Sequence, residues 1–207
     1  MSTILNSPRS SWLIVSSVLL LGAVVLLMAP EEQSLGTGIK SVYVHVALTW
    51  TAMLGLVIAG IVGVASSVLA KNTWQRLSQT VTWISLALFA AGLLMSMIAA
   101  GINWGGVFWQ EPRTSAAIQV LVAGLVVQIA NSFPINFRIK GLLSFFLLVF
   151  MFWTILSIPD VLHPGDAART SPPAIRVTFY SLFALCTFLA IWLTWRIHRS
   201  HLVQEVN

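Results

Sequence analysis

The chain has 207 residues, of which 57% are hydrophobic and only 8% are charged. Because a soluble globular domain carries roughly 25% charged residues, this composition excludes that class and indicates a protein that lies mostly in a lipid bilayer. The formal net charge is +5, but the basic residues are scattered at the ends of apolar segments. With no basic patch or arm, we expect no nucleic acid partner.

Six apolar stretches are long enough to cross a membrane as helices. In chain order they cover about 12–30, 42–70, 79–101, 115–133, 141–158 and 175–196. We therefore expect an all-α integral membrane protein, a bundle of six transmembrane helices that forms one polytopic domain of residues 1–207. Arg9 precedes the first stretch as in a signal peptide, but the length of the stretch and the lack of a small-x-small cleavage site favour a retained helix.

The basic residues predict the orientation of this bundle. Seven of the eleven Lys and Arg fall on one side of the alternation, namely Arg9, Lys71, Arg76, Arg138, Lys140, Arg196 and Arg199. The other side holds Lys40, Arg113, Arg169 and Arg176. By the positive-inside rule both termini are cytoplasmic, and the longer loops face the external or periplasmic side of the cell's inner or plasma membrane.

Two of the four histidines are expected at the outer face. His45 opens the second stretch in the segment SVYVHVALTW, and His163 follows the fifth in PDVLHPGD. Two neutral imidazoles at one interface suit the two axial positions of a haem iron. An interfacial anchor or a helix cap explains either histidine alone equally well. Zinc is the rival metal, but it generally takes three or four ligands and would need Glu111 and Asp166 to converge on the same site.

The predicted loop between the third and fourth stretches, residues 103–115, reads NWGGVFWQEPRTS. Trp104 and Trp109 offer aromatic faces that can pack on a porphyrin plane. Gly105 lets the backbone approach such a plane, and the guanidinium of Arg113 can pair with a propionate. An aromatic belt at the interface is the alternative, although a belt needs neither glycines nor an acid-Pro-Arg turn.

Other features limit the chemistry. Cys186 is the only cysteine, so an internal disulfide, a CxxC redox pair and a CxxCH haem-attachment site are all excluded. No glycine-rich phosphate loop is present, so any ATPase that works with the chain is a separate subunit. Arg169 and Arg176 are weaker candidates for pairing with propionates, because an arginine at a helix end is more often a snorkelling anchor.

The loop resembles the tryptophan-rich WWD segment of cytochrome c assembly proteins, and the chain is most similar to the heme exporter protein C (CcmC) family. The resemblance spans all six stretches, and further matches are Tyr43, His45, Val46, Trp50, Leu162 and His163. The chain departs from the family pattern at Ala47, Phe108, Gln110 and Glu111. The last three replace two tryptophans and an aspartate of the family, while the spacing of the loop is kept.

The resemblance implies that His45 and His163 are the axial ligands of a non-covalently bound haem b. The residues implied at the outer edge of the haem are Trp104, Gly105, Trp109, Glu111 and Arg113. It also implies a haem-trafficking protein of cytochrome c maturation that catalyses no reaction of its own. Its partners would be a haem chaperone, other maturation subunits and an ABC-type ATPase complex.

Two other function classes stay open. An electron-transferring cytochrome b normally holds its haems between histidines inside the helices, to form a path across the membrane. A diverged, haemless permease or scaffold subunit of a larger complex would keep the fold without the ligand chemistry.

Overall fold

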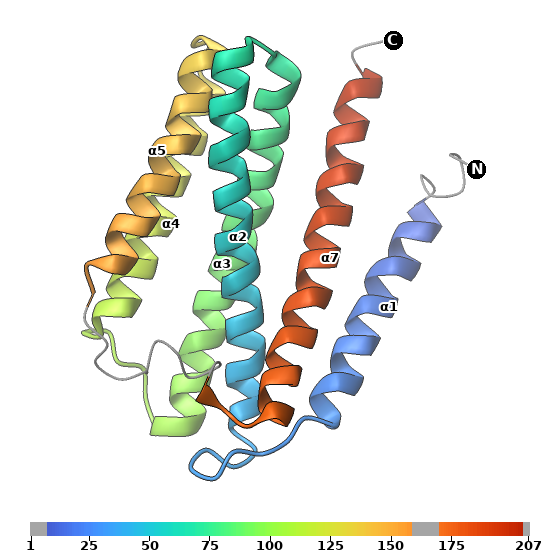
Figure 1. The fold of residues 1–207 in the computed structure, drawn as a ribbon, viewed down its shortest axis with the longest axis vertical. Coiled ribbons are helices and arrows are strands. Elements are labelled where there is room, and N and C mark those ends of the chain that lie inside the picture. Colours follow the sequence, from blue (N-terminus) through green and yellow to red (C-terminus); the bar gives the residue numbers. More distant parts are fainter. Residues whose placement is uncertain (1–7, 159–169, 205–207) are drawn as a thin grey trace.

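A computed structural model of the chain describes residues 8–158 and 170–204. These residues form the helices α1 (Pro8–Leu27), α2 (Ile39–Leu69), α3 (Asn72–Trp104), α4 (Pro112–Ser132), α5 (Phe137–Leu156) and α7 (Pro173–Gln204). The helices lie side by side in one elongated bundle (Figure 1). The predicted all-helical fold is therefore confirmed for the described part of the chain.

Five of these helices, α2 to α5 and α7, are long and apolar enough to cross a membrane. In α1 the apolar stretch Ser11–Leu27 is shorter than in the others, so a sixth crossing stays a prediction. Helix α3 extends beyond its predicted apolar span at both ends. Hydropathy marks the part of a helix that contacts lipid, whereas the helix itself continues through polar residues at the interface.

The ends of the bundle differ in composition, as the alternation of segments predicts. The α2–α3 turn, the α4–α5 turn and the end of α7 lie together at one end (Figure 1), which we call the basic end, and α1 begins in the same half of the bundle. The segment 28–38, the loop 105–111 and the start of α7 lie at the other, which we call the loop end.

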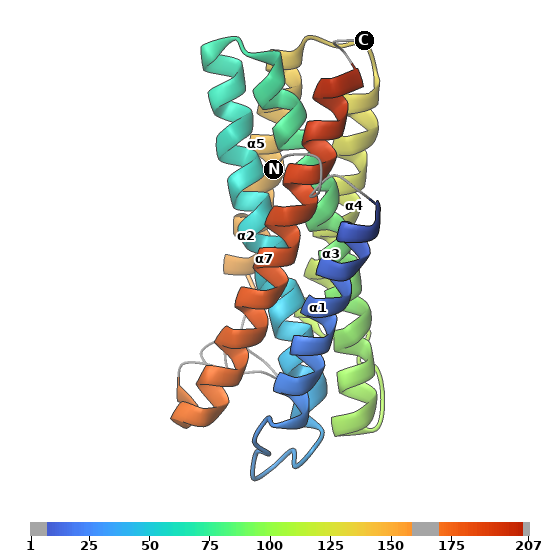
Figure 2. The same cartoon turned by 90° about the vertical axis from the view of Figure 1, so that its right-hand side faces the viewer.

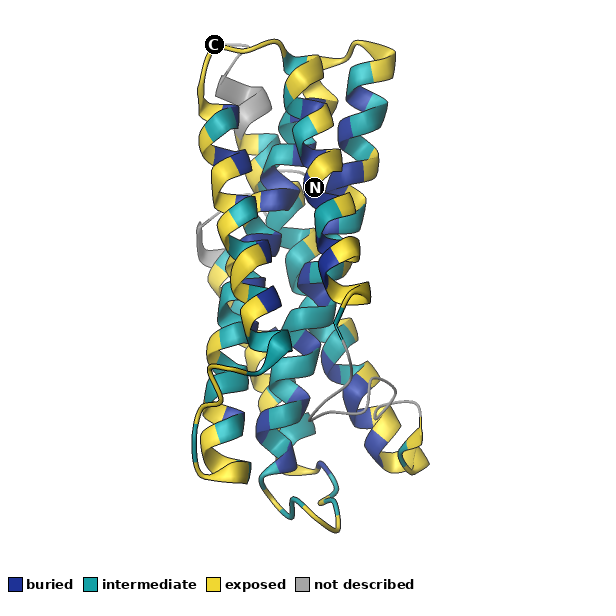
Figure 3. Ribbon diagram, turned by 90° about the vertical axis from the view of Figure 1, so that its left-hand side faces the viewer, coloured by how far each residue is buried: buried dark blue, intermediate teal, exposed yellow. Residues whose placement is uncertain are grey.

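The outward surfaces of the helices are apolar, and exposed residues cover them (Figure 3). On α5, for example, Leu142, Phe146 and Trp153 are 53%, 56% and 66% exposed. The interior, in contrast, contains buried polar groups such as Ser78, whose hydroxyl donates to the Ala59 carbonyl at 2.8 Å. Apolar patches of this extent are rare on soluble monomers, whereas lipid-facing apolar surfaces and polar contacts between helices are typical of membrane bundles.

Helix α2 lies at the centre and packs against α3, α5 and α7. It approaches the backbone of α5 closely, since a Cβ added to Gly63 would lie 2.6 Å from the carbonyl oxygen of Gly141. One turn away, the hydroxyl of Ser67 donates to the Arg138 carbonyl at 2.7 Å. Small residues at such a crossing let two backbones come close enough for dense packing without hydrophobic driving force.

Helices α7 and α1 complete the bundle on the opposite flank, with α1 outermost (Figures 1 and 2). Near the loop end, Phe179 of α7 packs on the fully buried ring of Tyr43. The Tyr43 hydroxyl also donates to the Pro30 carbonyl at 3.1 Å, which joins α2 to the segment between α1 and α2. The contacts of α1 are mainly with α7, so α1 is the least embedded helix among those described.

Candidate functional site

The side chain of His45 is held between α2 and α3. Its Nδ1 lies 2.8 Å from the carbonyl oxygen of Gly92. Because a carbonyl oxygen only accepts hydrogen bonds, Nδ1 carries a proton, and in the neutral ring the lone pair is on Nε2. Ligating histidines usually donate their other ring N–H to a carbonyl or carboxylate in this way, which fixes the tautomer and the ring orientation.

Two small residues make this contact possible. The hydroxyl of Thr49, one turn along α2, lies 3.4 Å from Nδ1 of His45. Gly92 of α3 packs directly against Thr49. A Cβ added at Gly92 would lie 2.7 Å from the Thr49 hydroxyl oxygen and 3.2 Å from the Thr49 backbone nitrogen. The absence of a side chain at Gly92 therefore brings the two backbones together and exposes the carbonyl to the imidazole.

Tyr43 and Trp50, which match the CcmC pattern in the same segment, face a different helix. The ring of Trp50 lies against Phe179, Tyr180 and Phe183 of α7, with ring centroids 5.8 to 6.2 Å apart. Tyr43 and Trp50 are seven residues apart and so share one face of α2, whereas His45 lies on another. Their aromatic contacts with α7 position α2 at the loop end and thereby set the direction of His45.

Helix α3 carries the first tryptophan of the predicted loop. Trp104 is the last residue of α3 and 42% exposed, not part of a loop as the sequence interpretation had it. The preceding Asn103 ties this end to α2, since its Nδ2 lies 3.3 Å from both the Gly38 carbonyl and the Ser41 hydroxyl. The position of Trp104 is therefore set by helix packing rather than by loop geometry.

Gly105 ends α3. Its φ of 78° is left-handed, and its N–H donates to the Gly101 carbonyl at 3.2 Å. A helix that ends this way favours glycine, because a side chain is strained at positive φ. The structure thus gives Gly105 a role that does not depend on a porphyrin. The loop that follows leaves Trp109 64% exposed and Phe108 45% exposed.

Glu111 and Arg113 begin the next helix. Glu111 is the N-cap of α4 and Pro112 is its first residue, which places the carboxylate at the positive end of the helix dipole. The backbone of the loop is closed by the Glu111 N–H, which donates to the Phe108 carbonyl at 3.1 Å. The acid-Pro-Arg turn read in the sequence is therefore a helix start, and Arg113 lies in its first turn.

The predicted site residues lie at different depths along the bundle. Trp104 follows Gly92 by twelve residues on α3, a distance of roughly 18 Å at a rise of 1.5 Å per residue. The loop then runs back along the bundle to the start of α4 (Figure 1).

Along the axis of the bundle, Arg113 lies nearer to the level of His45 than Trp104 does. Gly124 of α4 packs against Leu86 of α3. Arg113 precedes Gly124 by eleven residues, and Gly92 follows Leu86 by six. In antiparallel helices this places Arg113 only about 8 Å farther out than Gly92. Of the expected edge residues, Arg113 is therefore better placed than Trp104 to reach a group that His45 binds.

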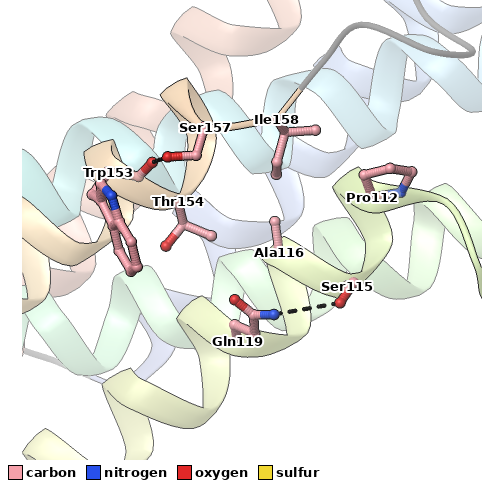
Figure 4. Close-up of a pocket in the computed structure, with 8 residues that line it drawn as sticks. All are labelled: Pro112, Ser115, Ala116, Gln119, Trp153, Thr154, Ser157 and Ile158. Carbon is pink, nitrogen blue, oxygen red and sulfur yellow. Dashed lines mark hydrogen bonds between the residues drawn. The ribbon is translucent and has the colours of Figure 1, made fainter.

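A cavity of about 270 Å³ opens beside this helix start, between α4 and the end of α5 (Figure 4). It is lined by Pro112, Ser115, Ala116, Gln119, Trp153, Thr154, Ser157 and Ile158. The Gln119 amide lies 3.5 Å from the Ser115 hydroxyl and the Ser157 hydroxyl donates to the Trp153 carbonyl, so the polar groups of the wall bond to one another. The cavity is smaller than a typical ligand pocket of about 300 Å³ or more.

The segment between α1 and α2 contributes a negative charge to the loop end. The carboxylate of Glu32 accepts hydrogen bonds from the Ser34 hydroxyl and from the backbone N–H of Leu35. These bonds, that of Ser34 above all, lower the pKa of Glu32. Its charge is therefore kept to lower pH than in a free glutamate.

His163, the second predicted ligand, lies outside the described residues, as does Arg169. Within residues 8–158 and 170–204, no three His, Cys, Asp or Glu side chains come together as a metal site. The described part of the chain thus offers the oriented imidazole of His45, while Asp166, which the zinc alternative needs, also lies outside the described residues. Sequence reasoning missed Gly92 and Asn103, since no local signal marks a carbonyl or an amide that reaches another helix.

Comparisons with known proteins give no independent identification. No family model matches the chain, and no curated protein matches its sequence. The resemblance to the CcmC family therefore stays a prediction from the motif residues.

Proposed function

We propose that this chain is a haem-handling membrane protein that holds haem b non-covalently near the loop end for transfer to a haem chaperone in cytochrome c maturation. The observation that supports this most is the hydrogen bond from Nδ1 of His45 to the Gly92 carbonyl. It orients the ring, and a neutral imidazole held this way has its lone pair on Nε2, the atom that would ligate iron. In this proposal His45 supplies one axial ligand and His163 the other.

The remaining residues have supporting roles in the proposal. Arg113, in the first turn of α4, pairs with a propionate of the cargo haem. Trp109, in the loop that runs back toward α4, provides an exposed aromatic face suited to the porphyrin edge, and Trp104, at the outer end of α3, provides one suited to a partner protein. The chain itself forms and breaks no covalent bond in this scheme, and an ATPase complex would be a separate partner.

We further propose that the basic end faces the cytoplasm and the loop end faces the periplasm or the exterior. A phosphatase that is active only outside the cytoplasm should be inactive when fused after Asn207 and active when inserted at Gln110, because the basic residues favour retention of their end inside. The opposite pattern would contradict the orientation and place His45 near the cytoplasmic face.

A visible spectrum of the purified full-length chain tests the function. We expect a Soret band and the sharp α and β bands of a six-coordinate haem with two imidazole ligands. Extraction into acidic organic solvent should release this haem, since the only cysteine, Cys186, offers no thioether attachment motif. A chain that takes up no haem after expression with excess haem would support a permease or scaffold role instead.

Replacing Trp109 by alanine should weaken haem retention by about fivefold, because aromatic packing contributes on the order of 1 kcal/mol beyond burial. Trp104→Ala, at the outer end of α3, should instead weaken transfer of the haem to the partner. Trp83→Ala is the matched control, since Trp83 is also on α3 and 52% exposed but lies far from the loop end. Haem occupancy per protein is measured by spectroscopy, and membrane insertion by fractionation.

A separate variant probes the acid at the start of α4. Glu111→Gln keeps the shape of the side chain but removes the charge, so we expect it to impair cytochrome c maturation more than haem binding. Full occupancy together with normal maturation in the Trp104, Trp109 and Glu111 variants would show that this region is only an interfacial belt.

A further inference from the structure

A second cavity, of about 690 Å³, lies at the basic end between the start of α3 and the start of α5. Its lining residues are Asn72, Gln75, Arg76, Gln79, Ile135, Asn136, Phe137 and Lys140. It is more than twice the size of the cavity at the loop end and falls within the range of small-ligand sites. The proposed haem site, at the other end of the bundle, does not involve it.

The cavity contains a buried amide with no protein partner. Gln75 is 1% exposed, yet neither its Nε2 nor its Oε1 has a hydrogen-bond partner in the described structure. A buried polar group left this way costs about 1–3 kcal/mol. Such groups in a cavity wall are usually satisfied by a ligand or water. Gln75 therefore has a donor and an acceptor at the cavity wall that the protein itself leaves without a partner.

The neighbouring amides are already used for structure. Gln128 of α4 donates to the Gln79 carbonyl at 3.2 Å, and the Asn131 amide lies 3.3 Å from the Gln128 side-chain oxygen. The Asn131 carbonyl in turn accepts from the Lys140 ammonium at 2.6 Å. This network joins α3, α4 and α5 beside the cavity.

The electrostatics of the cavity favour an anion. Arg76 and Lys140 both line it, and it lies at the N-terminal ends of α3 and α5, which carry the positive ends of two helix dipoles. The acidic residues of the described chain, Glu31, Glu32 and Glu111, are all at the loop end. Two cations and the starts of two helices therefore border one cavity, and none of its lining residues is a carboxylate.

The surroundings of the cavity are those of the lipid headgroup region. Ile135 and Phe137 form an apolar part of its wall, and Ile135 is 37% exposed. On α3, next to the lining residue Gln75, Trp74 is 40% exposed, and tryptophan is enriched at headgroup depth. A free inorganic anion needs no apolar wall, whereas the glycerol and acyl part of a phospholipid does.

We propose that this cavity binds the phosphate headgroup of an anionic phospholipid from the leaflet that the basic end meets. Arg76 and Lys140 neutralise the phosphate diester, and the Gln75 amide donates to a phosphate oxygen and accepts from a headgroup hydroxyl. Basic pockets between transmembrane helices commonly take such lipids. Phosphatidylglycerol, which has both a phosphate diester and hydroxyls, is the suitable probe.

The test is the thermal unfolding of the purified full-length chain in neutral detergent, followed by tryptophan fluorescence. Phosphatidylglycerol at roughly ten times its Kd should raise the Tm by about 3–6 °C for a chain of this size. Phosphatidylcholine at the same concentration should raise it much less. Equal stabilisation by phosphatidylcholine would overturn the proposal. Inorganic phosphate that matches the effect at equal ionic strength would assign the cavity to the free anion and overturn the lipid assignment.

Substitutions test whether the stabilisation by phosphatidylglycerol arises at this cavity. Gln75→Met removes the buried amide at similar volume, so it should raise the Tm without lipid and abolish the increment that phosphatidylglycerol gives. Arg76→Gln should also reduce the increment, whereas Arg138→Gln should keep it. Arg138 is exposed at the same end and is not among the lining residues, so it controls for the loss of one charge. A full increment in both Gln75→Met and Arg76→Gln would contradict the site.

Discussion

Replacing His45 by alanine should lower haem affinity by more than about 100-fold, because loss of a partner that merely orients a ligand already costs 10- to 100-fold. The sharper variant is His45→Gln. Its amide can still donate to the Gly92 carbonyl that Nδ1 reaches at 2.8 Å, but it supplies no imidazole to iron. We therefore expect His45→Gln to fold and insert as the original chain does, yet to lose the six-coordinate spectrum.

Absorbance spectra of the purified variants, normalised to protein, measure this effect. His198→Ala and His201→Ala are the controls, because both positions are in the last part of α7 at the basic end and should leave the spectrum unchanged. Exogenous imidazole should restore six-coordination to His45→Gly. If His45→Gln keeps the original spectrum and occupancy, the histidine is only a structural link between α2 and α3, and the proposed ligand is wrong.

Gly141→Ala should destabilise the bundle by about 1–3 kcal/mol, the usual cost of overpacking, and lower the Tm by several degrees. An added Cβ at Gly141 would clash with the backbone carbonyl oxygen of Gly63 and with the Ser67 hydroxyl. Backbone cannot rotate away as a flexible side chain can, so α2 and α5 must separate. That movement would also stretch the hydrogen bond from Ser67 to the Arg138 carbonyl.

Thermal unfolding in detergent measures the loss, and Gly101→Ala is the matched control. A Cβ at Gly101, within α3, meets nothing within 4 Å, so alanine there should be neutral or stabilising by up to about 1 kcal/mol. Gly63→Ala should act as Gly141→Ala does, and the double variant should cost less than the sum, because both changes open the same contact. Additive effects, or equal Tm values for the Gly101 and Gly141 variants, would show that this crossing does not limit stability.

The sequence was sufficient to predict the apolar helices, because a helix needs about 20 consecutive apolar residues to cross the bilayer and such a run is visible in the sequence itself. The helices in the described part of the chain follow the order of the predicted stretches, and five of them are confirmed as long enough and apolar enough to cross. Helix ends were less predictable. Asn72 begins α3 and Trp104 ends it beyond the apolar span, because capping and packing, not hydropathy, decide where a helix stops.

The sequence also predicted correctly that His45 lies toward the end of the bundle that holds the longer loops. It did not predict that His45 is held by Gly92, 47 residues away, since that contact exists only once α2 and α3 pack. Nor did it predict the cavity around Gln75, which forms where the starts of α3 and α5 meet. Hydropathy depends on neighbours in the chain, so the sequence alone is enough to predict it. The direction of the His45 ring and the lack of a partner for the Gln75 amide depend on which helices pack together. Only the tertiary structure decides that packing.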